Sequence, residues 1–95
     1  MPYRFDIYIG SDNGSRRIND GYLGKVRQWA DANFPDGYTL LRGEGCYRGL
    51  SEDSLVVNVL SDCDLPLRGQ LDGLKRNLSQ EVILLVRSQV EFEVI

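Results

Sequence analysis

The sequence predicts an α+β domain with the element order βαββαβ, which is the order of a ferredoxin-like two-layer sandwich. Three observations predict it. The first ten residues alternate between apolar and polar side chains, as in a strand with one buried face. Two later segments show the apolar spacing of amphipathic helices. Two strand-like segments lie between these helices, and a further apolar segment follows the second one. We therefore expect a four-stranded antiparallel sheet with two helices on one face.

Length and charge restrict the class of protein. The chain has 95 residues, of which 42% are hydrophobic, so residues 1–95 are predicted to form a single domain. Its net charge of −3 gives no positive field, and nucleic acid is not expected as a partner. No apolar run reaches the roughly 20 residues of a membrane helix, and the N-terminal alternation does not resemble a signal peptide. We expect a cytoplasmic protein with no membrane contact.

The first strand and helix follow from local patterns. Tyr3, Phe5, Ile7 and Ile9 form the apolar face of the strand. The turn-forming segment 10–15 ends it. The predicted helix then begins near Ile18, and Pro35, Asp36 and Gly37 end it. Its apolar face comprises Ile18, Tyr22, Val26, Trp29, Ala30 and Phe34.

A hairpin follows the first helix. Its predicted strands are Tyr38–Leu41 and Leu55–Leu60, which are rich in aliphatic, aromatic and β-branched residues. Residues 43–53 between them contain Gly43, Gly45, Gly49 and several charges, so this segment is predicted to be an irregular connection.

The second helix is predicted with Asp64 as its cap and Pro66 in its first turn. Leu67, Leu71, Leu74 and Leu78 provide its apolar stripe. The continuous apolar run 82–86 predicts a last strand covered on both faces. Alternation over residues 90–94 predicts a C-terminal strand extension.

Two helices cover only one face of the predicted sheet. Tyr8, Val56 and Leu60 then project from the other face, which leaves more exposed apolar surface than a monomer usually carries. We expect a homo-oligomer, most simply a two-fold dimer. The alternative is that the C-terminal tail covers the chain's own sheet.

Alternating strand direction gathers three segments at one end of the sheet: residues 10–17, 43–53 and 79–81. We expect the amides that start the first helix, together with nearby arginines, to hold a small anionic, nucleotide-like ligand. The alternative is that these arginines form solvated ion pairs with neighbouring acids. The predicted ligand-binding residues are Asp12, Asn13, Arg16, Arg17, Arg48, Glu52 and Gln80.

The composition excludes several chemistries. The chain has no histidine, so it cannot form Ser-His-Asp or Cys-His catalytic sites. Its two cysteines, Cys46 and Cys63, lack the spacing of a metal site, and no disulfide between them is expected. Glu52 and Asp53 are adjacent, and neighbouring side chains in a strand point to opposite faces, so they are not expected to chelate a metal together. No metal, cofactor or catalytic residue is assigned. Cys46, beside Arg48, is the one candidate for a lowered-pKa thiol.

Several short motifs resemble those of an uncharacterised family of small bacterial and phage proteins. The matched residues are Phe34, Gly37, Thr39, Gly45, Tyr47, Arg48, Gly49, Glu52, Gln80 and Glu81. The match spans about two thirds of the chain, and it departs where Cys46 and Tyr47 replace an aromatic pair or a tryptophan. The resemblance implies no particular activity.

Three functions are compatible with the sequence. The leading hypothesis is a non-catalytic binding module for a small anionic ligand or a protein partner. If the chain is phage-derived, analogy extends this hypothesis to a counter-defence factor that blocks a host protein. The second is a small hydrolase or isomerase with Glu52 as base and Arg48 as electrostatic stabiliser. The third is a regulatory or structural subunit that acts through its sheet face.

Overall fold

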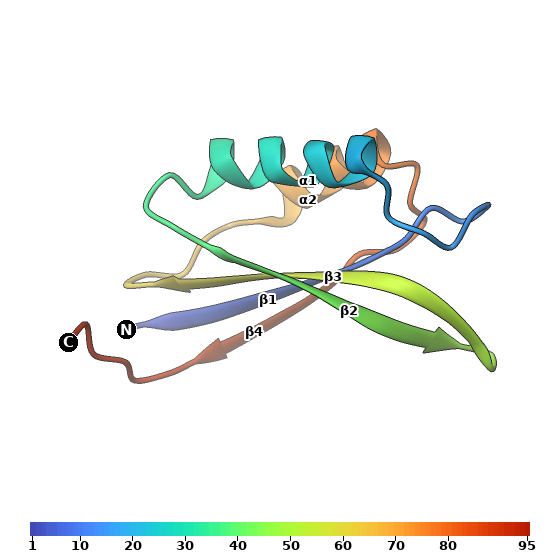
Figure 1. The fold of residues 1–95 in the computed structure, drawn as a ribbon. Helices are drawn as coiled ribbons and strands as arrows, with labels where there is room; N and C mark the ends of the chain where they lie inside the picture. The colour runs from blue at the N-terminus through green and yellow to red at the C-terminus, as the bar shows by residue number, and fades with distance from the viewer.

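The computed structural model describes residues 1–95 as four strands and two helices (Figure 1). The elements are β1 (Tyr3–Gly10), α1 (Asp20–Asn33), β2 (Thr39–Tyr47), β3 (Leu50–Ser61), α2 (Arg68–Asn77) and β4 (Leu84–Gln89). The sheet order is β2-β3-β1-β4, and all neighbouring strands are antiparallel. Both helices lie on the same face of the sheet (Figure 1). The predicted ferredoxin-like sandwich is confirmed.

The core lies between the sheet and the helices. Alternate residues of the two central strands, β1 and β3, point toward the helices, and Phe5, Ile7, Leu55 and Val57 are fully buried. The apolar faces predicted for both helices supply the opposite side. Helix α1 contributes Tyr22, Leu23, Val26 and Ala30, whereas α2 and its flanks contribute Leu67, Leu71, Leu74 and Leu78.

The start of α2 differs from the prediction, since Pro66 precedes the helix, which begins at Arg68. Helix α1 begins after Asn19, whose side-chain Oδ1 accepts a hydrogen bond of 2.9 Å from the Tyr22 amide. Asp64 does not cap α2. Its carboxylate instead accepts two hydrogen bonds from the Arg87 guanidinium of β4, and Leu67 occupies the cap position without a side-chain bond. A bidentate partner for Asp64 replaces the single amide that a cap would offer.

The hairpin is longer and more regular than predicted. Residues 43–53 are not an irregular connection, because β2 continues to Tyr47 and β3 resumes at Leu50. Only Arg48 and Gly49 form the turn, with φ angles of 52° and 78°. Positive φ at both central residues is characteristic of a type I′ hairpin turn. The ladder runs past the edge of the helical layer, where no apolar face is needed, and its polar composition therefore concealed the strands.

The C-terminal part also differs from the prediction. The first two residues of the run 82–86 precede β4, and β4 is an edge strand whose outer face is exposed, with Leu84 57% exposed. Residues 90–95 form no strand, so the predicted extension is wrong. A single bond from the Val90 amide to the Pro2 carbonyl, 3.2 Å long, connects this segment to the N-terminus.

The sheet face away from the helices is uncovered. Leu41, Val56, Tyr8 and Leu84 are direct cross-strand neighbours and form one apolar row across all four strands. Three of these side chains are exposed: Leu41 (53%), Tyr8 (42%) and Leu84 (57%).

Neither α1 nor α2 has the length and hydropathy of a membrane-spanning helix.

Candidate functional site

The three segments predicted to meet at one end of the sheet do so. The Gln80 side chain donates a 2.7 Å hydrogen bond from Nε2 to the Ser11 carbonyl. The Ser11 hydroxyl donates to Oε2 of Glu52 at 3.3 Å. The Asp53 amide donates to the Arg16 carbonyl at 3.0 Å. These bonds join the loop after β1, the start of β3 and the approach to β4 at the hairpin end of the molecule.

A groove of about 640 Å³ opens at this junction, and we call it the Glu52 groove. Its volume lies in the range of small-molecule sites. One side is polar, and the other is aromatic and aliphatic. Its lining residues are Tyr8, Ile9, Gly10, Asn13, Gly45, Cys46, Tyr47, Glu52, Ser54, Gln80, Glu81, Val82 and Leu84.

Glycines create the space in this groove. Gly45 is the cross-strand partner of Glu52, whereas Gly43 and Gly10 flank Ser54 on its two sides. Strand alternation therefore places all three glycines on the uncovered face of the sheet, beside Glu52. A side chain at Gly45 would meet Glu52 and Ser54 at 3.6–3.7 Å, which is ordinary contact. The protein has room for larger residues there, and the missing side chains leave an open floor.

Glu52 is held from behind by a buried network. Ser11 is only 1% exposed, and its hydroxyl bonds to the Glu52 carboxylate. The carbonyls of Ser11 and Gly10 accept hydrogen bonds from Gln80 and from the Tyr22 hydroxyl respectively. The Glu52 carboxylate is thus oriented by a network that includes residues of β1, α1 and the segment before β4.

Ser11 and Tyr22 were not predicted as site residues. Ser11 belongs to a turn-like segment, and Tyr22 fits the apolar face of α1, so no local signal separates either one from a structural residue. Burial raises the pKa of Tyr22 to about 12, and the nearby Asp12 and Glu52 charges act in the same direction, whereas the hydrogen bond with Gln80 opposes them. The Tyr22 hydroxyl therefore remains a proton donor throughout the neutral range.

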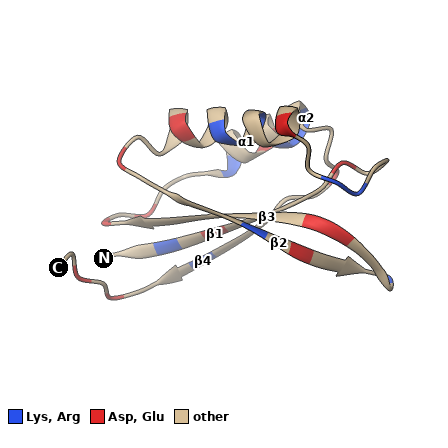
Figure 2. Cartoon of the chain, in the orientation of Figure 1, with Lys and Arg blue, Asp and Glu red and all other residues tan.

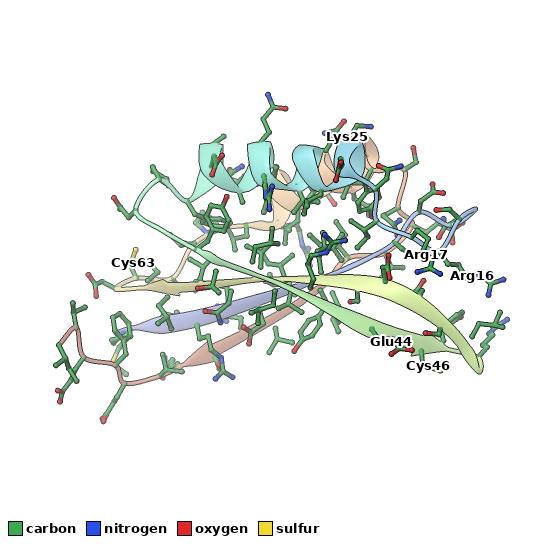
Figure 3. The ribbon with its side chains drawn as sticks, viewed as in Figure 1. Arg16, Arg17, Lys25, Glu44, Cys46 and Cys63 are labelled. Carbon is green, nitrogen blue, oxygen red and sulfur yellow. The ribbon has the colours of Figure 1, made fainter.

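A second hollow, the arginine cleft, lies next to the groove. It has a volume of about 340 Å³ and lies between the loop after β1 and the start of β3. Its lining residues are Gly14, Ser15, Arg16, Arg17, Ser51, Glu52 and Asp53. Figure 3 shows Arg16 and Arg17 at the same end of the molecule as Glu44 and Cys46 of the hairpin. Figure 2 shows basic residues in this loop and acidic residues on both hairpin strands.

Two amides of the loop that leads into α1, those of Ser15 and Ile18, already have side-chain partners. The Asp12 carboxylate accepts from the Ser15 amide at 3.0 Å, and this bond lowers the pKa of Asp12. The Asp53 carboxylate accepts from the Ile18 amide at 2.9 Å. Neither Arg16 nor Arg17 makes an ion pair. The guanidinium groups are therefore the free donors of this cleft.

The other predicted site residues take different positions. Asn13 lines the Glu52 groove and also a small hollow of about 160 Å³ with Arg16, Tyr47, Leu50 and Glu52. Arg48 occupies the hairpin turn, where its guanidinium carbon lies 5.2 Å from the centre of the Tyr47 ring. It lines neither the groove nor the cleft. Asn13, Glu52 and Gln80 are thus brought together in the groove, and Arg16 and Arg17 in the cleft.

Glu52 and Asp53 lie on opposite sides of β3, as strand alternation predicted. Glu52 lines the groove on the uncovered face, whereas Asp53 bonds to the loop that leads into α1. No group of three His, Cys, Asp or Glu side chains is arranged to hold a metal ion. Both cysteines are free and exposed, and they lie at opposite ends of the sheet (Figure 3).

No protein-family model matches the chain, and no curated protein matches it. Among the solved structures that match the chain are two of phage SAM lyases. A phage SAM lyase in complex with S-methyl-5'-thioadenosine has a TM-score of 0.61 and 14% sequence identity, with 93% of this chain and 81% of that chain covered. A phage SAM lyase in the apo state has a TM-score of 0.60 and 14% identity, with coverages of 90% and 78%. The chain is therefore similar in fold, over nearly its whole length, to phage SAM lyases.

Proposed function

We propose that this protein binds an adenosine-type nucleoside with a sulfur substituent in the Glu52 groove. The observation that carries the proposal is the groove itself, in which an oriented carboxylate faces aromatic and aliphatic side chains across a glycine floor. A base can stack on Tyr8 or Tyr47, because aromatic rings accept any base face. Glu52 and Gln80 offer hydrogen-bond partners to ribose hydroxyls. A structural relative that holds a thioadenosine supports the same ligand class.

The charge of the groove refines the expected ligand. Glu52 and Glu81 line it, and no lysine or arginine does. A neutral or cationic nucleoside is therefore favoured there over the anion expected from the sequence, because an anion would face like charges in a half-buried site. The arginine cleft remains the candidate position for any anionic part of a ligand.

Thermal unfolding with a panel of nucleosides and nucleotides tests the binding proposal. A ligand that binds only the folded state at 100 times its dissociation constant adds about 2.7 kcal/mol of stability. We expect S-methyl-5'-thioadenosine and related thionucleosides to raise the melting temperature, and adenosine phosphates to raise it less. A panel in which only phosphates raise the melting temperature would contradict the assignment of the groove.

Turnover is a second candidate, favoured by the acidic lining without a counter-cation. A carboxylate such as Glu52 stabilises a sulfonium centre and can accept a proton from the β carbon of a sulfur substituent. The electron pair of that C–H bond then forms a double bond, and the carbon–sulfur bond breaks with its electron pair left on the sulfur as a neutral thioether. Arg48 does not line the groove, so this version assigns it no catalytic role. Incubation of wild-type protein and Glu52→Gln with SAM, followed by chromatography, separates the candidates. Product formation by wild type alone indicates catalysis, whereas binding without product indicates a binding module.

We also propose that the chain forms a homo-oligomer through the apolar row of the uncovered face. Tyr8 and Leu84 belong both to this row and to the wall of the Glu52 groove. A second copy on this face would bury exposed apolar surface and shield the groove from solvent. Because the similar solved structures include phage proteins, we also favour a phage origin and an action against a host process.

A further inference from the structure

We infer that residues 90–95 form an assembly strand, which continues β4 and pairs antiparallel with β4 of a second copy of this chain. The inference rests on the homo-oligomer of the proposed function. It deepens that proposal because it assigns the segment and the strand edge through which the copies join.

Residues 90–95 have the side-chain pattern of a strand but form none. Val90, Phe92 and Val94 alternate with Glu91 and Glu93, and no strand extends past the end of β4. Val94 is 94% exposed. Phe92 and Val94 line an open hollow of about 590 Å³ together with residues at the end of β3. The segment's own chain therefore leaves its apolar side chains incompletely covered.

The apolar side of this segment continues the uncovered face of the sheet. Leu84 lies on that face because it is the cross-strand neighbour of Tyr8, and Val86 lies there because alternate residues of a strand share a face. The same alternation, continued as a strand, places the three apolar residues of the segment on the uncovered face. A partner's segment at this edge would extend the apolar row beyond β4.

The outer edge of β4 is free to take another strand. Strand β4 pairs with β1 only, so one row of its backbone groups has no strand beside it. The Val90 amide donates toward the β1 side, to the Pro2 carbonyl at 3.2 Å. Because backbone groups alternate in direction along a strand, the amides of Leu85, Arg87 and Gln89 point to the open edge.

This edge also lacks the charges that usually protect an edge strand. The one charged side chain of β4 is Arg87. Its guanidinium donates to the Asp64 carboxylate and lies 4.9 Å from the centre of the Tyr3 ring, so it is held against its own chain. The other sheet edge, β2, carries Arg42 and Glu44. Strand β4 is therefore the edge that better accepts a partner.

One two-fold register matches apolar side chains across this edge. In an antiparallel pairing centred on Gln89, Phe92 lies opposite the partner's Val86 and Val94 lies opposite the partner's Leu84. All four side chains lie on the uncovered face, and apolar cross-strand pairs of this kind stabilise a sheet.

The same register matches charges on the other face. It places Glu91 opposite the partner's Arg87. The Asp64 carboxylate accepts only from Nε and Nη2 of Arg87, so N–H donors of this guanidinium remain for a second carboxylate. A second copy of this chain thus supplies both the apolar and the acidic side chains that the edge of β4 can bind.

Sedimentation velocity over a concentration series tests the assembly strand. Phe92→Asp/Val94→Asp should weaken association about a hundredfold or more, since the apolar contacts are lost twice in a two-fold pairing. Gln28→Asp/Ala32→Asp is the matched control, because it adds the same two charges on the exposed side of α1. This control should associate like wild type.

A second pair of variants distinguishes strand pairing from side-chain contact. Glu91→Pro and Glu91→Ala both remove the carboxylate, but only proline removes the amide that donates to the partner strand. The segment forms no strand within its own chain, so proline leaves the fold of each copy intact. We expect Glu91→Pro to weaken association about tenfold or more beyond Glu91→Ala.

Equal association of the two Glu91 variants, or wild-type association of Phe92→Asp/Val94→Asp, would overturn the assembly strand and leave an oligomer through the apolar row standing. A wild-type protein that stays monomeric over the whole series would overturn the oligomer and the inference together. Neither result bears on nucleoside binding, which the thermal unfolding panel tests separately.

Discussion

Tyr22→Phe is expected to destabilise the protein at neutral pH. Tyr22 is only 9% exposed, and its hydroxyl donates to the Gly10 carbonyl beneath the groove. Phenylalanine keeps the ring packing and removes the donor, so the carbonyl loses a partner in a place that water reaches poorly. Such a loss costs about 1–2 kcal/mol.

The same substitution should reduce the sensitivity of the fold to alkali. The pKa of Tyr22 is raised from its ordinary value of 10 to about 12. Between these two pH values the unfolded chain releases a proton that the folded protein retains, so stability falls as the pH rises through this window. The total loss of unfolding free energy across this window is about 3 kcal/mol, and about 1.4 kcal/mol of it has occurred by pH 11.

Urea denaturation of wild type and Tyr22→Phe at pH 8 and pH 11 measures this effect. We expect wild type to lose about 1.4 kcal/mol more than the variant between the two pH values. Tyr38, whose pKa is raised by its hydrogen bond to Asp31, is present in both proteins and cancels from the comparison. Equal losses of unfolding free energy in the two proteins would refute the assignment of Tyr22 as a buried proton donor.

Three further predictions concern the groove and the uncovered face. Gly45→Val should keep or raise the melting temperature, because the new side chain meets only ordinary contacts and valine favours strands. The same variant should bind thionucleosides about tenfold or more weakly in calorimetry. Unchanged affinity would contradict the role of the glycines in forming the groove. Ser11→Ala should change stability by less than about 1 kcal/mol and weaken binding several-fold, since Glu52 loses its orienting hydroxyl; an affinity equal to wild type would remove Ser11 from the site. Leu84→Lys should shift the protein to monomer in gel filtration with light scattering, since the apolar row gains an unpaired charge; a monomeric wild-type protein would exclude the oligomer.

Much of the fold was predictable from the sequence because its signals are local. Alternation in β1 and the leucine spacing of α2 each report one buried face, and both faces are buried in the structure. The meeting of Glu52 and Gln80 was also predictable, since it follows from the alternation of strand direction. The ladder through residues 43–53 was missed because its strands lie past the helical layer and have no apolar face to reveal them.

The groove itself could not be predicted. It exists because Gly10, Gly43 and Gly45 share one face beside Glu52, which depends on the pairing register of three strands. A slip of one residue would move each strand's side chains to the other face, and the register of β2 against β3 is fixed by the two-residue turn at Arg48 and Gly49, which the sequence analysis did not predict. The occupied loop amides were also invisible, because the Asp53 that binds the Ile18 amide is 35 residues away in the chain.

An NMR titration of isotope-labelled protein with S-methyl-5'-thioadenosine tests the central claim most directly. The account predicts that the amides of Gly10, Gly45, Glu52 and Gln80 shift on binding, whereas those of Gly37 and Cys63, at the opposite end of the sheet, do not. Shifts concentrated at Gly37 and Cys63, or a spectrum unchanged at millimolar ligand, would contradict the assignment of the Glu52 groove as a nucleoside site.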